Sequence, residues 1–277
     1  KVFIPIFTGI GAAMSLLAVF CKERVIEPPM EKRAKVTFFK GAKNVLKNKY
    51  FWITNVSNVI GQWHGLVGNL LSWWFVYSLR MEWFSGIAGN IVAMGMTFGN
   101  VLCPIMTKRF QKRNILISFR GITIITVLGI ALAVKMENIF IFLFALFLKN
   151  AIAPVMDGVN VGLNADILTY HQWKYGERAD AMSGVFGWFL NPISVAIGYI
   201  MPWLLSNVGF TSDWDVLFDT QILNKVFNLY TWGSVIGLIL LTVPFIFYDL
   251  TKEKHDMCVK ELQERLASIE ADANDKN

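Results

Sequence analysis

The chain has 277 residues, of which 55% are hydrophobic, 14% aromatic and 17% charged, with a formal net charge of +6. A mean hydropathy of +0.46 leaves too little polar side-chain area to cover a water-soluble domain, so this composition excludes an ordinary globular protein. We therefore predict an all-α, polytopic membrane protein. Only segments that close all their backbone hydrogen bonds survive in a bilayer, and about 20 apolar helical residues cross it.

Seven segments are apolar and long enough to cross a membrane. In chain order they are residues 2–20, 51–79, 86–106, 115–134, 139–163, 182–205 and 226–248. The lengths of their connections predict a transmembrane helix (1–20), a central cytoplasmic loop (21–50), a six-span bundle (51–248) and a cytoplasmic tail (249–277). The chain begins at Lys1 directly in apolar sequence, so we expect it to be the carboxy-terminal part of a longer protein.

The orientation follows from the basic residues in the connections, which remain on the cytoplasmic side. Nine lysines and arginines lie between residues 22 and 49, and four more lie between residues 108 and 113. The intervening connections hold one each, at Arg80, Lys135 and Lys225. We expect an inner (plasma) membrane protein with a cytoplasmic carboxy terminus. Its positive charge then suits anionic lipid, and a nucleic-acid partner is unnecessary.

The central loop contains an amphipathic pattern. Its apolar residues recur at helical spacing among lysines: Phe38, Phe39, Ala42, Val45 and Leu46. This spacing predicts a helix on the inner leaflet, and a solvated linker is the alternative. The three histidines are widely separated and lack ligand spacing with cysteines or carboxylates, so we expect no metal site, no cofactor and no catalytic residues.

Polar residues inside the spans carry the functional information, because an amide or charge in hydrocarbon must face another helix or water. In the second span, Asn55, Asn58, Gln62 and Asn69 fall within about 60° of one another, and Trp73 completes the stripe. One interpretation is interhelical hydrogen bonding, worth about 0.6 kcal/mol each. The other is a substrate cavity lined by these residues.

In the fifth span, one sector of about 100° carries Lys149, Asn150, Asp157, Asn160 and Asn164. Lys149 lies close to the bilayer midplane, where it needs a carboxylate, a substrate oxygen or a water-filled cavity. Structural ion pairing with another helix and substrate or coupling-ion chemistry are the two interpretations. The sixth span places Trp188 and Asn191 beside Pro192, which predicts a kinked or broken helix with possible substrate contacts.

The segment ADILTYHQWKYGER, Ala165 to Arg178, resembles the cytoplasmic turn of the glycoside-pentoside-hexuronide cation symporters of the major facilitator superfamily. The matching residues are Asp166, Tyr170, Trp173, Lys174, Gly176 and Arg178, whereas Thr169 replaces a second aspartate. Weaker similarity covers NKYF at Asn48 to Phe51, the aromatic residues from Trp73 to Tyr77, and KELQERL at Lys260 to Leu266. The resemblance spans most of the chain.

This resemblance implies a twelve-span sugar or glycoside symporter, coupled to sodium or protons, that works by alternating access. The chain would supply the last span of the first half, the central loop and the whole second half, a major-facilitator-like six-helix half bundle. Its partners would be a sugar, membrane lipid and the missing amino-terminal half, which holds most of the coupling-cation site. By the resemblance, Asp166, Tyr170, Lys174 and Arg178 help to close the inner gate. Pro192 replaces a family lysine, which puts cation coupling and the usual sugars in question.

Two alternatives remain at this stage: a seven-helix membrane receptor and a transporter of a non-sugar solute. The long basic loop after the first span and the absence of a lysine in the middle of the last span argue against a receptor. A membrane-embedded enzyme would need clustered catalytic side chains, which the sequence lacks.

Overall fold

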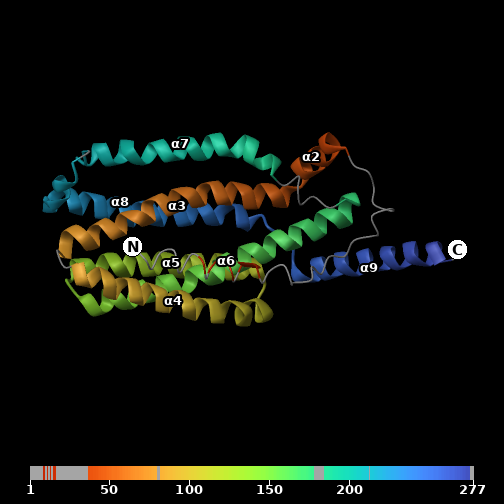
Figure 1. The fold of residues 1–277 in the computed structure, drawn as a ribbon, viewed down its shortest axis with the longest axis horizontal. Helices are drawn as coiled ribbons and strands as arrows, with labels where there is room; N and C mark the ends of the chain where they lie inside the picture. Colours follow the sequence, from red (N-terminus) through yellow and green to blue (C-terminus); the bar gives the residue numbers. More distant parts are fainter. Residues whose placement is uncertain are drawn as a thin grey trace. The chain divides into compact units, whose positions relative to one another are not determined.

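The computed structural model describes residues 37–79, 82–177, 184–211 and 213–274, with isolated positions between residues 9 and 16. In chain order the helices are α2 (Phe38–Lys47), α3 (Lys49–Leu79), α4 (Glu82–Arg109), α5 (Lys112–Lys135), α6 (Ile139–Tyr175), α7 (Val185–Asn207), the short 3-10 helix η3 (Trp214–Phe218), α8 (Thr220–Ile246) and α9 (Lys252–Asn274) (Figure 1). No β-strand occurs among these described residues, so the all-α prediction is confirmed.

Two compact units are distinguished by their internal contacts. One comprises residues 34–259, which we call the helical bundle, and the other comprises residues 1–33 and 260–277. The predicted first span, residues 2–20, lies outside the described residues except for isolated positions. In the second unit, the end of α9 carries two pairs at i,i+4 spacing, Lys260 with Glu264 and Arg265 with Glu261.

Among the described residues of the bundle, five helices are long and apolar enough to cross a membrane: α4 from Gly86, α5, α6, α7 and α8. The second predicted span is also a helix, since α3 has 31 residues, but it does not reach the same hydropathy over a membrane-length window. The cause is the stripe that includes Asn58, Gln62 and Asn69, because each amide lowers the mean hydropathy of α3.

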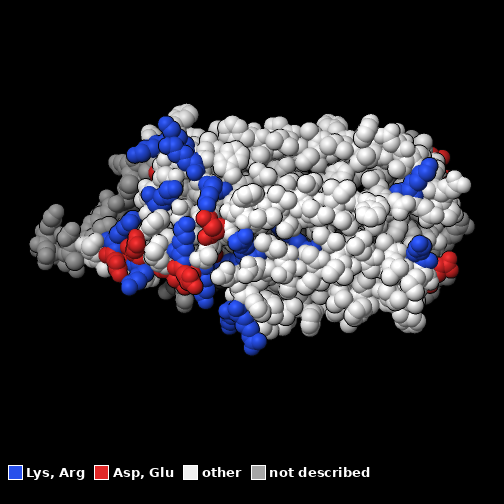
Figure 2. Space-filling view, turned by 180° about the vertical axis from the view of Figure 1, so that it is seen from behind, with Lys and Arg blue, Asp and Glu red and all other residues white. Residues whose placement is uncertain are grey.

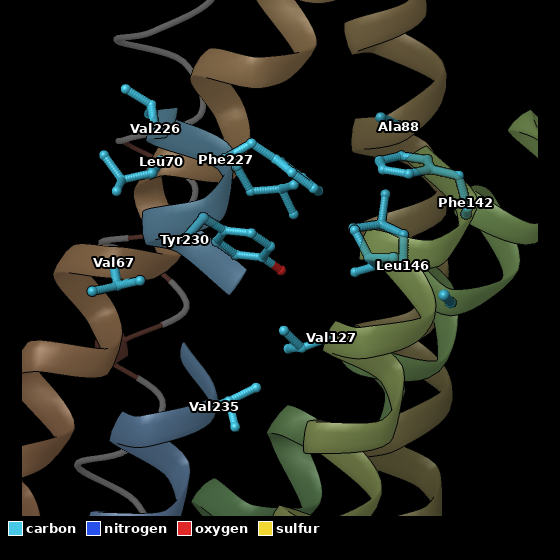
Figure 3. Packing of buried hydrophobic residues seen from close by; sticks show 14 of the residues in the cluster. Val67, Leu70, Ala88, Val127, Phe142, Leu146, Val226, Phe227, Tyr230 and Val235 are labelled. Carbon is cyan, nitrogen blue, oxygen red and sulfur yellow. The ribbon is translucent and has the colours of Figure 1, made fainter. Parts of the chain in front are cut away.

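The bundle helices pack in neighbouring pairs. α3 lies along α8 and α7, α6 lies along α4 and α5, and α5 also contacts α8 (Figure 1). Apolar side chains fill the space between these groups, as the close view shows for Val67 of α3, Tyr230 of α8 and Leu146 of α6 (Figure 3). A second cluster of buried apolar side chains packs the helices together at the other end of the bundle, and it includes Tyr50 and Tyr170.

Helix α6 is longer than the sequence suggested. We predicted a span over residues 139–163 followed by a polar turn, whereas α6 has 37 residues and continues through most of the ADILTYHQWKYGER segment. Between Ala165 and Tyr175 no glycine or proline interrupts the helix, and the turn begins only at Gly176, whose φ of 72° lies in the left-handed region that favours glycine. At the other end, Asn138 caps the helix by accepting from the amides of Phe140 and Ile141.

Helices α4 and α6 cross at very short range. A Cβ atom built on Gly95 would lie 2.7 Å from the carbonyl oxygen of Phe147, and one built on Gly99 would collide with the carbonyl group of Ala151. Both obstacles are backbone atoms, which cannot rotate away. Gly95 and Gly99 therefore permit the close packing of these two helices, as is common where membrane helices approach.

Helix α2 is present where the amphipathic pattern predicted a helix, but its apolar residues point in two directions. Ala42 and Val45 are buried against the bundle, whereas Phe38 and Phe39 are exposed. Basic side chains gather at the end of the bundle where α2 lies, and a wide band between the two ends is almost free of charge (Figure 2). This distribution is typical of a protein whose apolar band is covered by lipid.

Candidate functional site

The polar stripe of α3 is exposed over its central part. Asn58, Gln62 and Asn69 are exposed, while Ser57 and Val67, on other sides of α3, are buried. In the described part of the chain, no hydrogen bond joins the side chains of Asn58, Gln62 or Asn69 to another helix, so the structure gives no support to interhelical hydrogen bonding. The polar face is available to water, to a solute or to further protein.

A cavity of about 270 Å³ brings the predicted stripes of α3 and α6 together. Its lining includes Asn55 and Asn58 of α3, Asn164 of α6 and Phe51. The amide of Asn55 donates to the Phe51 carbonyl at 2.8 Å, which holds its side chain along the helix. Amide groups both donate and accept hydrogen bonds, so three of them in one cavity can bind a hydroxyl-bearing solute.

Lys149 contacts a tyrosine instead of a carboxylate. Its Nζ atom lies 3.4 Å from the Tyr230 hydroxyl of α8 and 5.4 Å from the centre of the Tyr230 ring. In Figure 3 the Tyr230 oxygen points from α8 toward the side of the bundle formed by α5 and α6. No carboxylate forms an ion pair with Lys149 within the described ranges. The structural ion pair offered as one interpretation is therefore not present there.

The remaining polar residues of α6 divide between two environments. Asn150 donates to the carbonyl of Leu146 and packs beside Gly95 of α4, so it belongs to a helix contact. Asp157 is exposed, as is Asn164, which reaches the cavity described above. The polar face of α6 that the sequence predicted is thus only partly accessible to a solute.

The aromatic candidates lie at different ends of the bundle. Trp73 packs against Phe210 at 5.2 Å and Trp214 at 4.9 Å between ring centres, near the end of α3. Trp188 lies in the first turn of α7 beside Phe38, and 68% of its surface is exposed. Asn191 is also exposed, and α7 continues unbroken through Pro192. The structure does not bring Trp73 and Trp188 into one pocket.

Asp166 is held inside the bundle. Both of its carboxylate oxygens lie 2.7 Å from Lys112 Nζ at the start of α5, and His255 Nε2 of α9 lies 3.5 Å from one of them. Lys112 also donates to the Gly162 carbonyl at 3.1 Å, so it bridges two turns of α6. The two charges therefore tie α5 to α6.

Two of the other proposed gate residues, Tyr170 and Lys174, contact each other and an aromatic ring of α3. Tyr170 is buried and packs edge-on against Tyr50 at 4.9 Å, and Lys174 lies over the Tyr170 ring at 5.8 Å. Arg178 lies outside the described residues. The gating role of these residues stays a prediction, since their described contacts are within one bundle.

A second ionic cluster joins the start of α3 to the residues after α8. Asp249 accepts hydrogen bonds at 2.7 Å from Lys49 and from the Tyr50 hydroxyl, and Lys254 donates to the same hydroxyl at 3.2 Å. Burial alone would raise the pKa of Asp249, but these hydrogen bonds and the charges of Lys49 and Lys254 outweigh it and lower the pKa to about 2.

The family is decided by a comparison with known families. A family model described as MFS/sugar transport protein matches residues 2–252, which is most of the chain. The chain belongs to this family. It is therefore a multi-pass membrane chain of a family of transporters, not of enzymes, as the resemblance of the ADILTYHQWKYGER segment predicted.

The chain is also similar in sequence to two curated proteins. It is 24% identical to the uncharacterized symporter YjmB of Bacillus subtilis (strain 168) over 283 residues, which cover 96% of this chain and 58% of the relative. It is 23% identical to an isoprimeverose transporter of Lactiplantibacillus pentosus over 258 residues, which cover 92% of this chain and 52% of the relative. The chain thus spans about half the length of these relatives. No solved structure matches it significantly.

Within this sugar transport fold, Arg120 of α5 is a polar residue that the sequence reasoning missed. Only 3% of its surface is exposed, and it donates to the Leu241 carbonyl at 2.6 Å and lies over the Phe245 ring at 4.6 Å. It also approaches the Ser57 hydroxyl at 3.4 Å. A single arginine in an apolar span was itself a signal, because such a charge must find partners. Its partners come from α3 and α8, which the sequence could not reveal.

Proposed function

We propose that this chain forms one half of a sugar or glycoside symporter that is coupled to sodium or protons and works by alternating access. The observation that carries the proposal is the cavity in which Asn55, Asn58 and Asn164 meet. A sugar offers several hydroxyl groups, which amide side chains can bind both as donors and as acceptors. The exposed face of α3, continuing from this cavity to Asn69, would line the path.

Coupling and orientation belong to the same proposal. One relative is named a symporter, which supports cation coupling, and the gathering of basic residues at one end supports a cytoplasmic carboxy terminus in the inner membrane. The relatives are nearly twice as long as the aligned region, so the first half of the transporter and most of the coupling-cation site would lie outside this sequence. Transport experiments therefore use the full-length protein.

The test replaces amides of the stripe by apolar residues of similar size. Asn58→Leu and Gln62→Leu should each reduce sugar uptake by tenfold or more while the amount of protein in the membrane stays near that of the wild type, because a buried sugar hydroxyl would lose its partner. Asn207→Leu is the matched control, since Asn207 is an exposed amide at the end of α7 that bonds only its own helix. Normal uptake by both stripe variants would exclude the proposed path.

A further inference from the structure

A buried polar network joins α2, the start of α3 and the end of α6. Its members are Asn44 of α2, Asn48 between α2 and α3, His171 of α6 and Glu177 just after α6. His171 is fully buried, Asn48 is 2% exposed and the side chain of Glu177 is 9% exposed. None of these four residues lines the amide-lined cavity.

The contact between Asn48 and His171 determines which nitrogen of a neutral imidazole carries the proton. The side-chain oxygen of Asn48 accepts from the amide of Tyr50 at 3.1 Å, so the NH2 group of Asn48 points toward His171. This group lies 3.5 Å from Nδ1 of His171, and an NH2 group can only donate. Nδ1 therefore accepts, and the single proton of the neutral ring is on Nε2.

The second nitrogen of the ring lacks a hydrogen bond. Nε2 of His171 has no hydrogen-bond partner in the part of the chain that the structure describes, although Oε1 of Glu177 lies only 3.8 Å away. That oxygen instead accepts from the side-chain amide of Asn44 at 2.8 Å. Buried polar groups normally have partners, so Asn44 and His171 are two competing donors to Glu177.

A proton added to His171 would change both contacts of the network. An imidazolium carries a hydrogen on each nitrogen, so Nδ1 can no longer accept from Asn48, and two donors would face each other. The positive ring would also attract Glu177 away from Asn44, because the attraction between opposite charges at this distance exceeds that between a carboxylate and a neutral amide. Both changes weaken the attachment of α2 to the end of α6.

The surroundings of the ring favour Glu177 as the group that responds to this proton. The charged groups that act on His171 are Glu177 and Lys174, of opposite sign. Lys174 is exposed and screened by water, whereas Glu177 is nearly buried. The ring also packs against Phe51 of α3 at 5.7 Å and Tyr175 at 4.6 Å between ring centres. Helix α7 carries no charged residue, and the basic residues of α2 are all exposed: Lys40, Lys43 and Lys47.

We propose that this network is a proton-sensitive latch, in which protonation of His171 releases α2 from the end of α6. With a neutral ring, Glu177 binds Asn44 and His171 binds Asn48, so α2 stays packed against the bundle. With a protonated ring, Glu177 pairs with His171 and both of these contacts are lost. The proposal concerns the conformation of the predicted central loop and depends on neither sugar transport nor cation coupling.

The test follows the position of α2 by the distance between two spin labels in the full-length protein. The labels are attached through Lys43→Cys in α2 and Lys108→Cys in α4, both at exposed positions, in a background without other cysteines. Double electron–electron resonance is measured from pH 8 to pH 5. One narrow distance is expected at pH 8, and a second, broader population should grow at least tenfold by pH 5. His171→Gln can still accept from Asn48 but does not titrate, so it should keep the single distance at every pH.

The matched control is His255→Gln, because His255 lies beside Asp166 instead of Glu177. It should respond to pH as the parent protein does. Glu177→Gln can still accept from Asn44 but lacks the attracting charge, so the second population should appear about one pH unit lower.

Three results would overturn the proposal. They are the absence of a second population in the parent protein, a pH response that persists in His171→Gln, and the loss of that response in His255→Gln. Should His171→Gln fail to fold, Glu177→Gln carries the test, since an unchanged response there also contradicts the latch. Sugar uptake is not measured, so failure here is distinct from failure of the proposed transport function.

Discussion

Replacing Asp166 by asparagine tests how the end of the bundle at which α5 begins is held together. Asp166→Asn removes the carboxylate that lies 2.7 Å from Lys112 and leaves the ammonium with the Gly162 carbonyl. The two side chains are 15% and 31% exposed, so the pair is intermediate between a surface pair and a fully buried one. Surface pairs contribute about 0–1 kcal/mol and breaking a buried pair costs about 3–5 kcal/mol, so we expect a loss of about 1–3 kcal/mol.

A double-mutant cycle measures this interaction directly. Asp166→Asn, Lys112→Gln and the double variant of the full-length protein are compared by thermal unfolding in detergent. Each single variant should lower stability, and the double variant should lose clearly less than the sum of the two. The same variants should increase cytoplasmic thiol labelling of a cysteine placed at Asn55, in a background without other cysteines. A shift of about 1–3 kcal/mol in the equilibrium between labelled and protected conformations corresponds to a change of about 5- to 150-fold in the population that can be labelled.

Additive effects of the two substitutions would refute this reasoning. They would mean that Asp166 and Lys112 do not stabilise each other, and that Asp166 acts on a group elsewhere. Glu253→Gln serves as the control for loss of a carboxylate, because Glu253 is exposed in the first turn of α9. It should change neither the Tm nor the labelling.

Three further predictions concern other parts of the bundle. Lys149→Met should reduce sugar uptake at least tenfold and Lys149→Arg should restore it only in part, because the site needs a compact positive charge; normal uptake by Lys149→Met would exclude a functional role. Gly99→Ala should lower stability by about 1–3 kcal/mol in thermal unfolding, since its Cβ would meet the backbone of α6, whereas Gly121→Ala, with open space around it, should not. Asp249→Asn should lower the Tm at pH 6 but progressively less as the pH falls from about 4 toward 2. The carboxylate with a pKa lowered to about 2 stabilises the fold only while it is ionised, so a pH-independent difference would contradict the ion pair with Lys49.

The helices could be predicted from apolar runs, but their ends could not. Hydropathy marks the lipid-covered part of a helix, so the span over residues 139–163 omitted the polar residues that continue α6 to Tyr175. The end of α6 could have been predicted from the local sequence, because Gly176 is the first residue after Asn164 that favours the end of a helix. Treating polarity as a turn signal was the error.

The candidate site was predictable to the extent that it depends on one helix at a time. A rotation of 100° per residue places Asn55 and Asn58 on one face of α3, and the structure shows that this face reaches Asn164 of α6. The partners of charged residues come from other helices, such as Tyr230 for Lys149 and Lys112 for Asp166. Such pairs depend on the packing of helices distant in sequence, which no periodicity reveals.

Polarity within a span has two meanings in this protein, and burial distinguishes them. Arg120 is a charged residue within the apolar part of α5, yet it is buried and bound to a carbonyl of α8, so it joins helices. The amides at Asn58, Gln62 and Asn69 are individually weaker, yet they are exposed and lower the hydropathy of a whole helix. Lipid cannot cover such a face without a large loss of hydrogen bonding, because hydrocarbon offers no partners. Water, solute or another part of the transporter must cover it, which is why α3 is the helix on which transport is to be tested first.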